Sequence, residues 1–143
     1  MKQVRLMILV LPYLYNFPEP FLGGAYRLSK VQAEKKAWEI CSKNDIELVV
    51  INPYLVIGEL LNKKGNKDEE LNFSCEMIRK YVNGSTKIVP NSYIGMVDVK
   101  DVAKALILAA ETPEAAGHRF ICCAETCEWI EIAKLMKSMY PNY

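Results

Sequence analysis

The chain has 143 residues, of which 51% are hydrophobic and 24% are charged, and its formal net charge at neutral pH is +1. This length fits one domain with a buried core, and the composition is that of an ordinary globular protein. Because the charge is near zero and no long basic run occurs, we expect neither a nucleic acid nor a membrane surface as a partner.

An apolar run near the N-terminus, from Leu6 to Leu11, predicts a buried parallel strand. The run is too short to span a bilayer, and the residues from Pro12 onward do not supply the small-residue cleavage site of a signal peptide. The next segment, from Asn16 to Gly24, contains two prolines and two glycines and is expected to be a loop.

A long helix is predicted from Gly24 to Asn44, because good helix formers fill this stretch and Asn44-Asp45 ends it. Tyr26 and Lys30 lie four residues apart, so they share a face of the helix. A nearby ammonium lowers the pKa of a tyrosine from about 10 towards the working pH. Such a tyrosine can exchange a proton with a carbonyl or alcohol oxygen. About one such spacing is expected by chance, so the pair gains weight only from its context.

The apolar, β-branched segment from Ile46 to Ile51 predicts a second buried strand, ended by Asn52-Pro53. A strand, a helix and a strand in this order predict a parallel βαβ unit and an α/β fold. Ligands of such sheets lie beyond the carboxyl ends of the strands. We therefore expect a bound cofactor near Asn52 to Gly58.

The second half of the chain alternates expected helices, strands and loops. A charged loop is expected from Leu61 to Glu70. Helices are expected at Leu71 to Val82, Val102 to Glu111 and Thr126 to Met139. The expected strands are two short ones, Thr86 to Val89 and Ile94 to Val97, and a buried one, Arg119 to Cys123. Asp98 or Asp101 is expected to cap the second of these helices. Core packing is expected for an apolar stripe on the last helix, at Trp129, Ile132, Ala133 and Met136.

The five cysteines are an odd number without a regular disulfide spacing, which indicates reduced thiols and a cytoplasmic protein. Cys122, Cys123 and Cys127 include no CxxC pair, and His118 is the single histidine. We therefore interpret them as buried small hydrophobic residues and expect no metal site.

From about Tyr26 to its end, the chain resembles the cinnamoyl-CoA reductase and dihydroflavonol reductase group of extended short-chain dehydrogenases. The resemblance rests on five blocks that occur in the family's order. They are a YxxxK helix (Tyr26 to Lys30, then Ala33-Glu34 and Trp38), an NPxxVxG strand end (Leu48 to Gly58), the following helix (Asn72 to Gly84), a V-x-V-x-D-V-A block (Val97 to Ala103) and a closing G-x-x-F-x-C strand (Gly117 to Cys122).

The resemblance implies part of an NAD(P)-binding Rossmann-like parallel sheet with helices, and reduction of a small carbonyl or CoA-thioester substrate by NADPH. Tyr26 would be the proton donor, and Lys30 would lower its pKa and hydrogen-bond the nicotinamide ribose. Pro53 and Val56 would line the nicotinamide pocket, and Ser74 would contact the cofactor. Hydride transfer is the chemistry of NADP(H) itself.

The chain also departs from the family pattern. It contains no G-x-x-G-x-x-G turn for the pyrophosphate, and the catalytic serine expected before the tyrosine helix has only Tyr13, Tyr15 or Asn16 as stand-ins. Asp98 replaces a histidine and Glu59 replaces a proline. We therefore expect a single partial domain, residues 1–143, that corresponds to a C-terminal half without the Gly-rich βαβ half. Its catalytic helix would span about residues 24–44 and its substrate side about residues 59–143.

Three functions stay open. The first is the NADP-dependent reductase, although the missing pyrophosphate turn predicts weak or absent nucleotide binding by the isolated chain. The second is a truncated, inactive chain that acts at most as an interaction module through an exposed sheet edge. The third is an NAD-dependent sugar-nucleotide epimerase, which shares YxxxK, but the surroundings of Trp38 and the NPxxVxG block fit the reductases better. The sequence names neither the substrate nor the oligomeric state.

Overall fold

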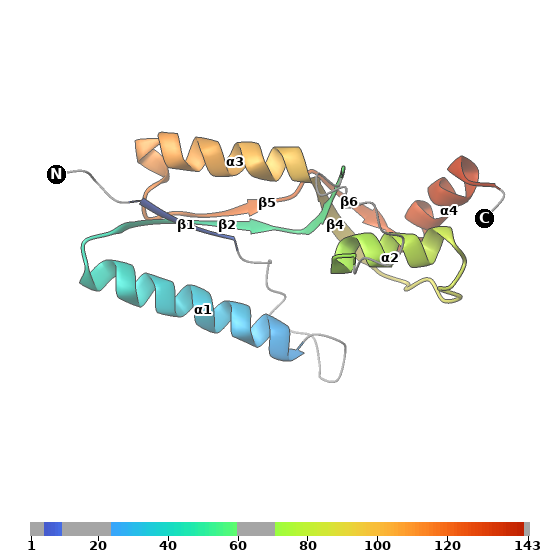
Figure 1. The fold of residues 1–143 in the computed structure, drawn as a ribbon, viewed down its shortest axis with the longest axis horizontal. Coiled ribbons are helices and arrows are strands. Elements are labelled where there is room, and N and C mark those ends of the chain that lie inside the picture. The colour runs from blue at the N-terminus through green and yellow to red at the C-terminus, as the bar shows by residue number, and fades with distance from the viewer. Residues whose placement is uncertain (1–4, 10–23, 60–70, 142–143) are drawn as a thin grey trace. The chain divides into compact units, whose positions relative to one another are not determined.

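The computed structural model describes residues 5–9, 24–59 and 71–141 of the chain (Figure 1). The predictions for Tyr13, Tyr15 and Asn16, for residues 16–23 of the first expected loop and for the loop at 61–70 lie outside these residues. The described residues form two compact units, which are considered separately below. The first unit takes its residues from 1–54 and 100–122, and the second takes its residues from 55–99 and 123–143.

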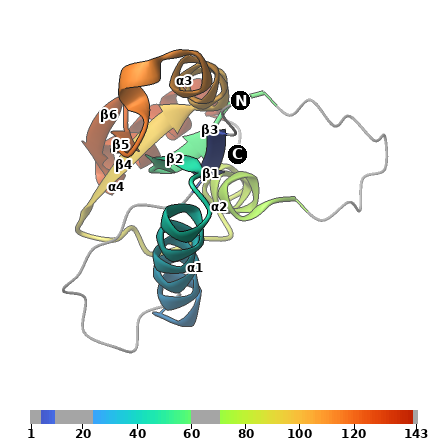
Figure 2. The same cartoon turned by 90° about the vertical axis from the view of Figure 1, so that its left-hand side faces the viewer.

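The first unit is a three-stranded parallel sheet with a helix on each face. Strands β1 (Arg5–Leu9), β2 (Glu47–Pro53) and β5 (Arg119–Cys122) lie in the order β1-β2-β5. Helix α1 (Gly24–Lys43) connects β1 to β2, and α3 (Val99–Glu111) with the short helix η1 (Pro113–Ala115) precedes β5. Helices α1 and α3 cover opposite faces of the sheet (Figure 2). Both predicted strands pair in parallel around the predicted helix, so the βαβ unit is confirmed.

The core of the first unit follows the alternation of side chains along β2. Leu48 and Val50 pack with Ala37 and Cys41 of α1. The intervening residues Val49 and Ile51 pack with Ala109 and Ala115 on the other face. Because successive side chains of a strand point to opposite faces, a central strand covered on both sides has no polar face. This burial explains the unbroken apolar run in the sequence.

A charged contact links α1 to the outer strand β5. The Arg119 Nε donates to Glu34 Oε1 over 2.7 Å, and Trp38 Nε1 donates to the same oxygen over 3.5 Å. Glu34 is only 8% exposed, so its carboxylate is satisfied by partners from the protein rather than by water alone. The contact fixes the middle of α1 against the sheet.

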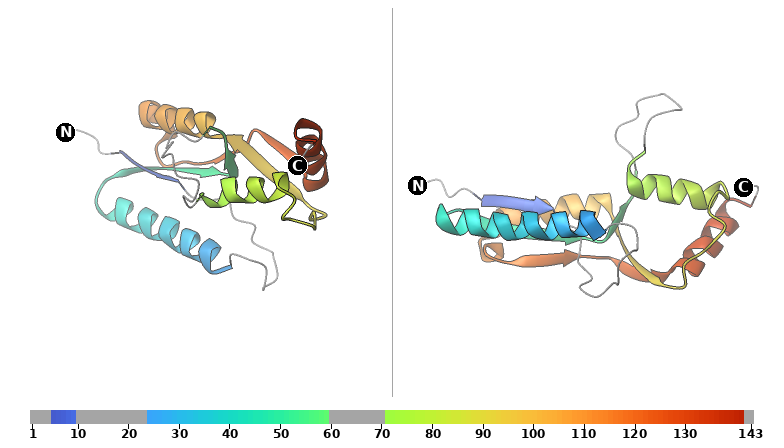
Figure 3. Two further views of the ribbon diagram at one scale, coloured as in Figure 1. Left: turned by 45° about the vertical axis from the view of Figure 1, so that its right-hand side comes forward. Right: turned by 90° about the horizontal axis from the view of Figure 1, so that it is seen from below.

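The second unit is a small mixed sheet with two helices. Strands β3 (Leu55–Ile57), β4 (Tyr93–Asp98) and β6 (Glu125–Glu128) lie in the order β3-β4-β6, with the first pair parallel and the second antiparallel. Helices α2 (Phe73–Val82) and α4 (Trp129–Met139) complete it (Figure 3). Trp129 is 7% exposed and stacks on Tyr81, with ring centroids 5.3 Å apart.

Two expectations about strands are wrong. No strand forms at residues 86–89, where Ile88 is 80% exposed and Pro90 has no backbone N–H to donate to a sheet. The strand that begins at Arg119 is not buried, because β5 lies at the outside of the described sheet, and Phe120 and Ile121 are 43% and 61% exposed. Likewise, Cys122 is half-buried and Cys123 is exposed, so neither is the buried residue that the sequence suggested.

Three helices begin elsewhere than expected. Helix α2 starts at Phe73 rather than at Leu71, because Asn72 is its N-cap. Helix α4 starts at Trp129 rather than at Thr126, because Glu125–Glu128 pair with β4 as strand β6. Helix α3 starts at Val99, directly after Asp98, and Asp101 lies in its first turn. The expected core stripe of α4 is confirmed for Trp129 and Ile132, while Ala133 and Met136 are half-buried.

None of the helices in the described ranges is both long and apolar enough to cross a membrane.

Candidate functional site

Tyr26 and Lys30 occupy the first two turns of α1, where the structure brings their side chains together. The Lys30 Nζ lies 5.3 Å from the centroid of the Tyr26 ring, within the range of a cation–π contact. Tyr26 is 50% exposed, so its phenol is open to a reacting partner. The pair therefore has the shared helix face that the sequence spacing predicted.

The same helix face is anchored one turn further along. Tyr26, Lys30 and Glu34 follow one another at four-residue steps, and Glu34 carries the contact to Arg119 described above. The face thus changes from exposed at Tyr26 to buried at Glu34. This arrangement presents a phenol and an ammonium at the open start of a helix whose middle is held against the sheet.

Two of the expected cofactor contacts lie at strands. Pro53 ends β2 in the first unit and is fully buried, whereas Val56 is the central residue of β3 in the second unit and is half-buried. Gly58, which closes the NPxxVxG block, has φ +136°, and a Cβ there would lie 2.8 Å from Val99 Cγ1. Only glycine fits this position, so the motif's glycine has a structural cause.

Asn52 begins the segment in which the sequence predicts a bound cofactor, although no role was predicted for its side chain. Its side chain is fully buried, and neither its Nδ2 nor its Oδ1 has a hydrogen-bond partner in the described structure. A buried, unpaired amide costs free energy and calls for an explanation. Its place at the carboxyl end of β2 is where parallel sheets hold their ligands. A polar residue at the end of an apolar run was the available signal.

Ser74 lies in the first turn of α2, in the second unit. Its Oγ donates to Asn72 Oδ1 over 3.0 Å, and the same oxygen accepts from the Cys75 backbone N–H over 2.9 Å. Asn72 is the N-cap of the helix, so Ser74 takes part in the capping arrangement. The Ser74 hydroxyl can still accept a hydrogen bond from a ligand.

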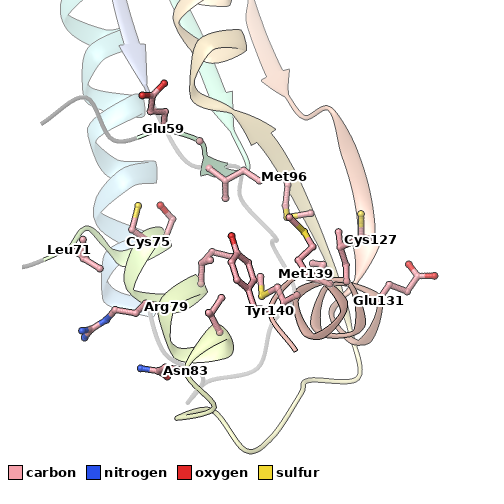
Figure 4. Close-up of a pocket in the computed structure, with 18 of the residues that line it drawn as sticks. Glu59, Leu71, Cys75, Arg79, Asn83, Met96, Cys127, Glu131, Met139 and Tyr140 are labelled. Carbon is pink, nitrogen blue, oxygen red and sulfur yellow. The ribbon is translucent and has the colours of Figure 1, made fainter. Parts of the chain in front are cut away.

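A pocket of about 1240 Å³ lies in the second unit, between α2 and α4 and next to β4 and β6 (Figure 4). We call it the α2–α4 pocket. Its lining is mostly apolar. It includes Leu71, Ile78, Val82, Ile132, Leu135 and Tyr140, together with three methionines, Met96, Met136 and Met139. Ser74 also lines it. An apolar cavity with few polar groups is the usual form of a small-molecule site. In the sequence, only the apolar stripes of the two helices indicated it.

Charged groups lie around the rim of the α2–α4 pocket. Arg79 is bound by Glu76 through two hydrogen bonds of 2.8 Å, and this contact holds the pKa of Glu76 below its usual range. Glu125 and Glu131 are among the lining residues. Burial raises the pKa of the Cys127 thiol, and the charges of Glu125 and Glu131 raise it further. Two carboxylates therefore lie near the Cys127 thiol at this end of the pocket.

No group of three or more His, Cys, Asp or Glu residues in the described ranges is arranged to hold a metal ion. Each unit thus holds a candidate site of its own: the Tyr26–Lys30 pair in the first unit and the α2–α4 pocket in the second.

Residues 19–123 match the model of a family described as the NAD dependent epimerase/dehydratase family. The chain is 41% identical over 118 residues to cinnamoyl-CoA reductase 1 of Petunia hybrida. The aligned residues make up 82% of this chain and 33% of the relative. It is 37% identical to tetraketide alpha-pyrone reductase 2 of Arabidopsis thaliana, with 82% and 35% covered. The chain therefore spans about a third of the length of these relatives.

Solved structures of reductases have the same fold as the described residues. Yeast methylglyoxal/isovaleraldehyde reductase, complexed with NADPH, is similar with a TM-score of 0.72 and 33% identity, covering 82% of this chain and 35% of that one. Vestitone reductase from alfalfa (Medicago sativa) has a TM-score of 0.70 and 29% identity, covering 87% and 37%. The expected α/β, Rossmann-like fold is confirmed.

Proposed function

This chain belongs to the NAD dependent epimerase/dehydratase family, as its resemblance to the reductase group indicated, and we propose that it acts in an NADP-dependent reduction of a carbonyl or CoA-thioester substrate. The named relatives are reductases, and a structural relative is complexed with NADPH. These identities favour the reductase over a sugar-nucleotide epimerase.

The contact between Tyr26 and Lys30 carries this proposal. In a reduction, the Tyr26 hydroxyl gives its proton to the oxygen of the substrate carbonyl, and a phenolate remains. The Lys30 ammonium, 5.3 Å from the ring centroid, stabilises the negative charge that develops on that phenolate. Anchoring of α1 at Glu34 keeps the pair in place and lowers the entropy cost of reaching the reactive geometry.

The residues proposed to hold NADP are Tyr26, Lys30, Pro53, Val56 and Ser74. The Lys30 ammonium makes no hydrogen bond to another described residue, so its N–H donors are available to ribose hydroxyls. Ser74 can accept a hydrogen bond, and Pro53 and Val56 offer apolar surface. When bound, NADPH supplies the hydride, which no side chain can provide.

The test is the substitution Tyr26→Phe, with Tyr93→Phe as the matched control. Tyr93 is 67% exposed and its hydroxyl donates to Glu128, away from α1 in the sequence. We expect Tyr26→Phe to lower carbonyl-dependent NADPH oxidation by about 10²- to 10⁴-fold, the usual loss of a proton donor, and to leave NADPH binding intact. Tyr93→Phe should change neither. Normal turnover by Tyr26→Phe would show that Tyr26 is not the proton donor.

The exposed strand β5 supports a second, non-catalytic candidate. Phe120 and Ile121 are 43% and 61% exposed on an outer strand of the sheet, and such strands associate with other chains. Under this alternative, the chain would bind no NADPH in a fluorescence titration and would form oligomers in sedimentation equilibrium. Saturable NADPH binding by a monomer that stays monomeric at high concentration would rule it out.

A further inference from the structure

We propose that the α2–α4 pocket selects an uncharged aromatic carbonyl compound and rejects anionic ones, CoA thioesters included. The proposal rests on the proposed function in taking the ligand of this pocket to be the substrate. Of the two substrate classes in the proposed function, carbonyl compounds and CoA thioesters, it keeps only the carbonyl compounds.

The centre of the pocket is apolar. Met96, Met139 and Tyr140 lie around it in Figure 4, while the labelled Arg79 and Glu131 carry their charged ends away from the centre. Burying an apolar ring against such a surface is favourable, and methionine sulfur makes additional attractive contacts with aromatic rings. Methionine side chains also adapt to ligands of different outline. The centre thus favours an aromatic group without charge.

The rim repels anions. Glu125 and Glu131 line the pocket, and both contribute to the raised pKa of the Cys127 thiol, which lies between them in sequence. An anion brought near Cys127 meets the same negative charges that disfavour the thiolate there. This repulsion lowers the affinity for any ligand that must place a carboxylate or phosphate at this end of the pocket.

The one cation among the described lining residues is already paired. Arg79 donates from Nε and from Nη2 to the two oxygens of Glu76, each over 2.8 Å. The Glu76 carboxylate compensates the charge of the guanidinium, so a ligand phosphate at Arg79 would gain less attraction than it would from an unpaired arginine.

The experiment measures binding by isothermal titration calorimetry of the full 143-residue chain with three probes. Cinnamamide is uncharged, cinnamate is its isosteric anion, and cinnamoyl-CoA joins the same acyl group to several phosphates. None of the three needs turnover to be scored. We expect cinnamamide to bind about tenfold more tightly than either anion at low salt, and added salt to reduce the difference.

The double variant Glu125→Gln/Glu131→Gln removes the rim charge while keeping the size of the side chains. It should bring the affinities for cinnamate and cinnamamide several-fold closer. The matched control is Glu114→Gln, which removes an exposed charge from η1 in the other unit and should leave the ratio unchanged.

Several results would overturn the proposal. These are cinnamate or cinnamoyl-CoA binding as tightly as cinnamamide, an absence of binding by all three probes, or a ratio that changes equally in Glu114→Gln. The proposed function fails separately, through normal turnover of Tyr26→Phe. Selective cinnamamide binding together with that turnover would keep the pocket assignment and reject Tyr26 as the proton donor.

Discussion

The two units differ in how completely they bury their apolar residues. In the first unit, β2 is buried on both faces, and Val49 and Val50 are inaccessible to solvent. In the second unit, α2 has no buried residue, and Leu135 and Met139 of α4 are 59% and 62% exposed. The first unit is therefore built as a rigid support for the Tyr26–Lys30 pair. The second keeps an open apolar pocket, which fits binding better than support.

The chain allows each unit to be followed separately, because its two tryptophans lie one in each unit. Trp38 packs against the core cluster of α1 and β2, and Trp129 stacks on Tyr81 in the second unit. In a Trp129→Phe background, fluorescence reports on the first unit, and in a Trp38→Phe background it reports on the second.

The largest loss of stability is expected from Leu48→Ala. Leu48 is 2% exposed and packs with Ala37 and Cys41, so its truncation leaves a cavity that the sheet cannot close. We expect a loss of about 2–5 kcal/mol in the free energy of unfolding, measured by urea titration of the Trp38 signal. The matched substitution Leu135→Ala, at an exposed leucine, should cost less than about 1 kcal/mol. Equal losses would mean that the two units are packed alike.

A smaller loss is expected from Glu34→Ala. The substitution leaves the Arg119 guanidinium and the Trp38 indole N–H without their shared acceptor. A part-buried donor without a partner costs about 1–3 kcal/mol, which urea unfolding followed by circular dichroism should detect. Glu34→Gln keeps an acceptor oxygen and should recover part of the loss.

The control for that substitution is Glu39→Ala on the same helix. Glu39 pairs with Lys36 and Lys43, but all three side chains are about half-exposed or more. Exposed ion pairs contribute little, so we expect a loss below about 1 kcal/mol. If Glu39→Ala cost as much as Glu34→Ala, the link between α1 and β5 would have no special role in holding the helix.

The sequence predicted the first unit well because its signals are local. The apolar run of β2, the helix formers of α1 and the four-residue spacing of Tyr26 and Lys30 each follow from the chain itself. The contact between Glu34 and Arg119 joins residues 85 positions apart, and no periodicity indicates it. Glu34 belongs to the YxxxK block of the family resemblance, but that block does not indicate which residue Glu34 contacts.

The second unit was predicted less well because its structure depends on pairing between distant segments. The residues from Thr126 to Glu128 were predicted to start a helix, yet they belong to strand β6 because β4 pairs with them. In the first unit, too, the exposure of β5 depends on its place in the sheet order, which its apolar sequence does not reveal. The α2–α4 pocket arises from helices that are far apart in sequence, so only the separate stripes were visible beforehand.

The smallest effect is expected from Asn72→Ala, which removes the N-cap of α2. The Asn72 Oδ1 accepts from the Cys75 N–H and the Ser74 hydroxyl, so both donors lose their partner in the variant. Loss of such a cap costs about 1 kcal/mol, whereas Asn72→Asp retains an acceptor and should cost much less. The loss should appear in the urea titration of Trp129 in the Trp38→Phe background. The same substitution is then made in the Trp129→Phe background, where Trp38 reports on the first unit. If the urea midpoint of the Trp38 signal shifted by the same amount, the two units would unfold as one cooperative body despite their different burial.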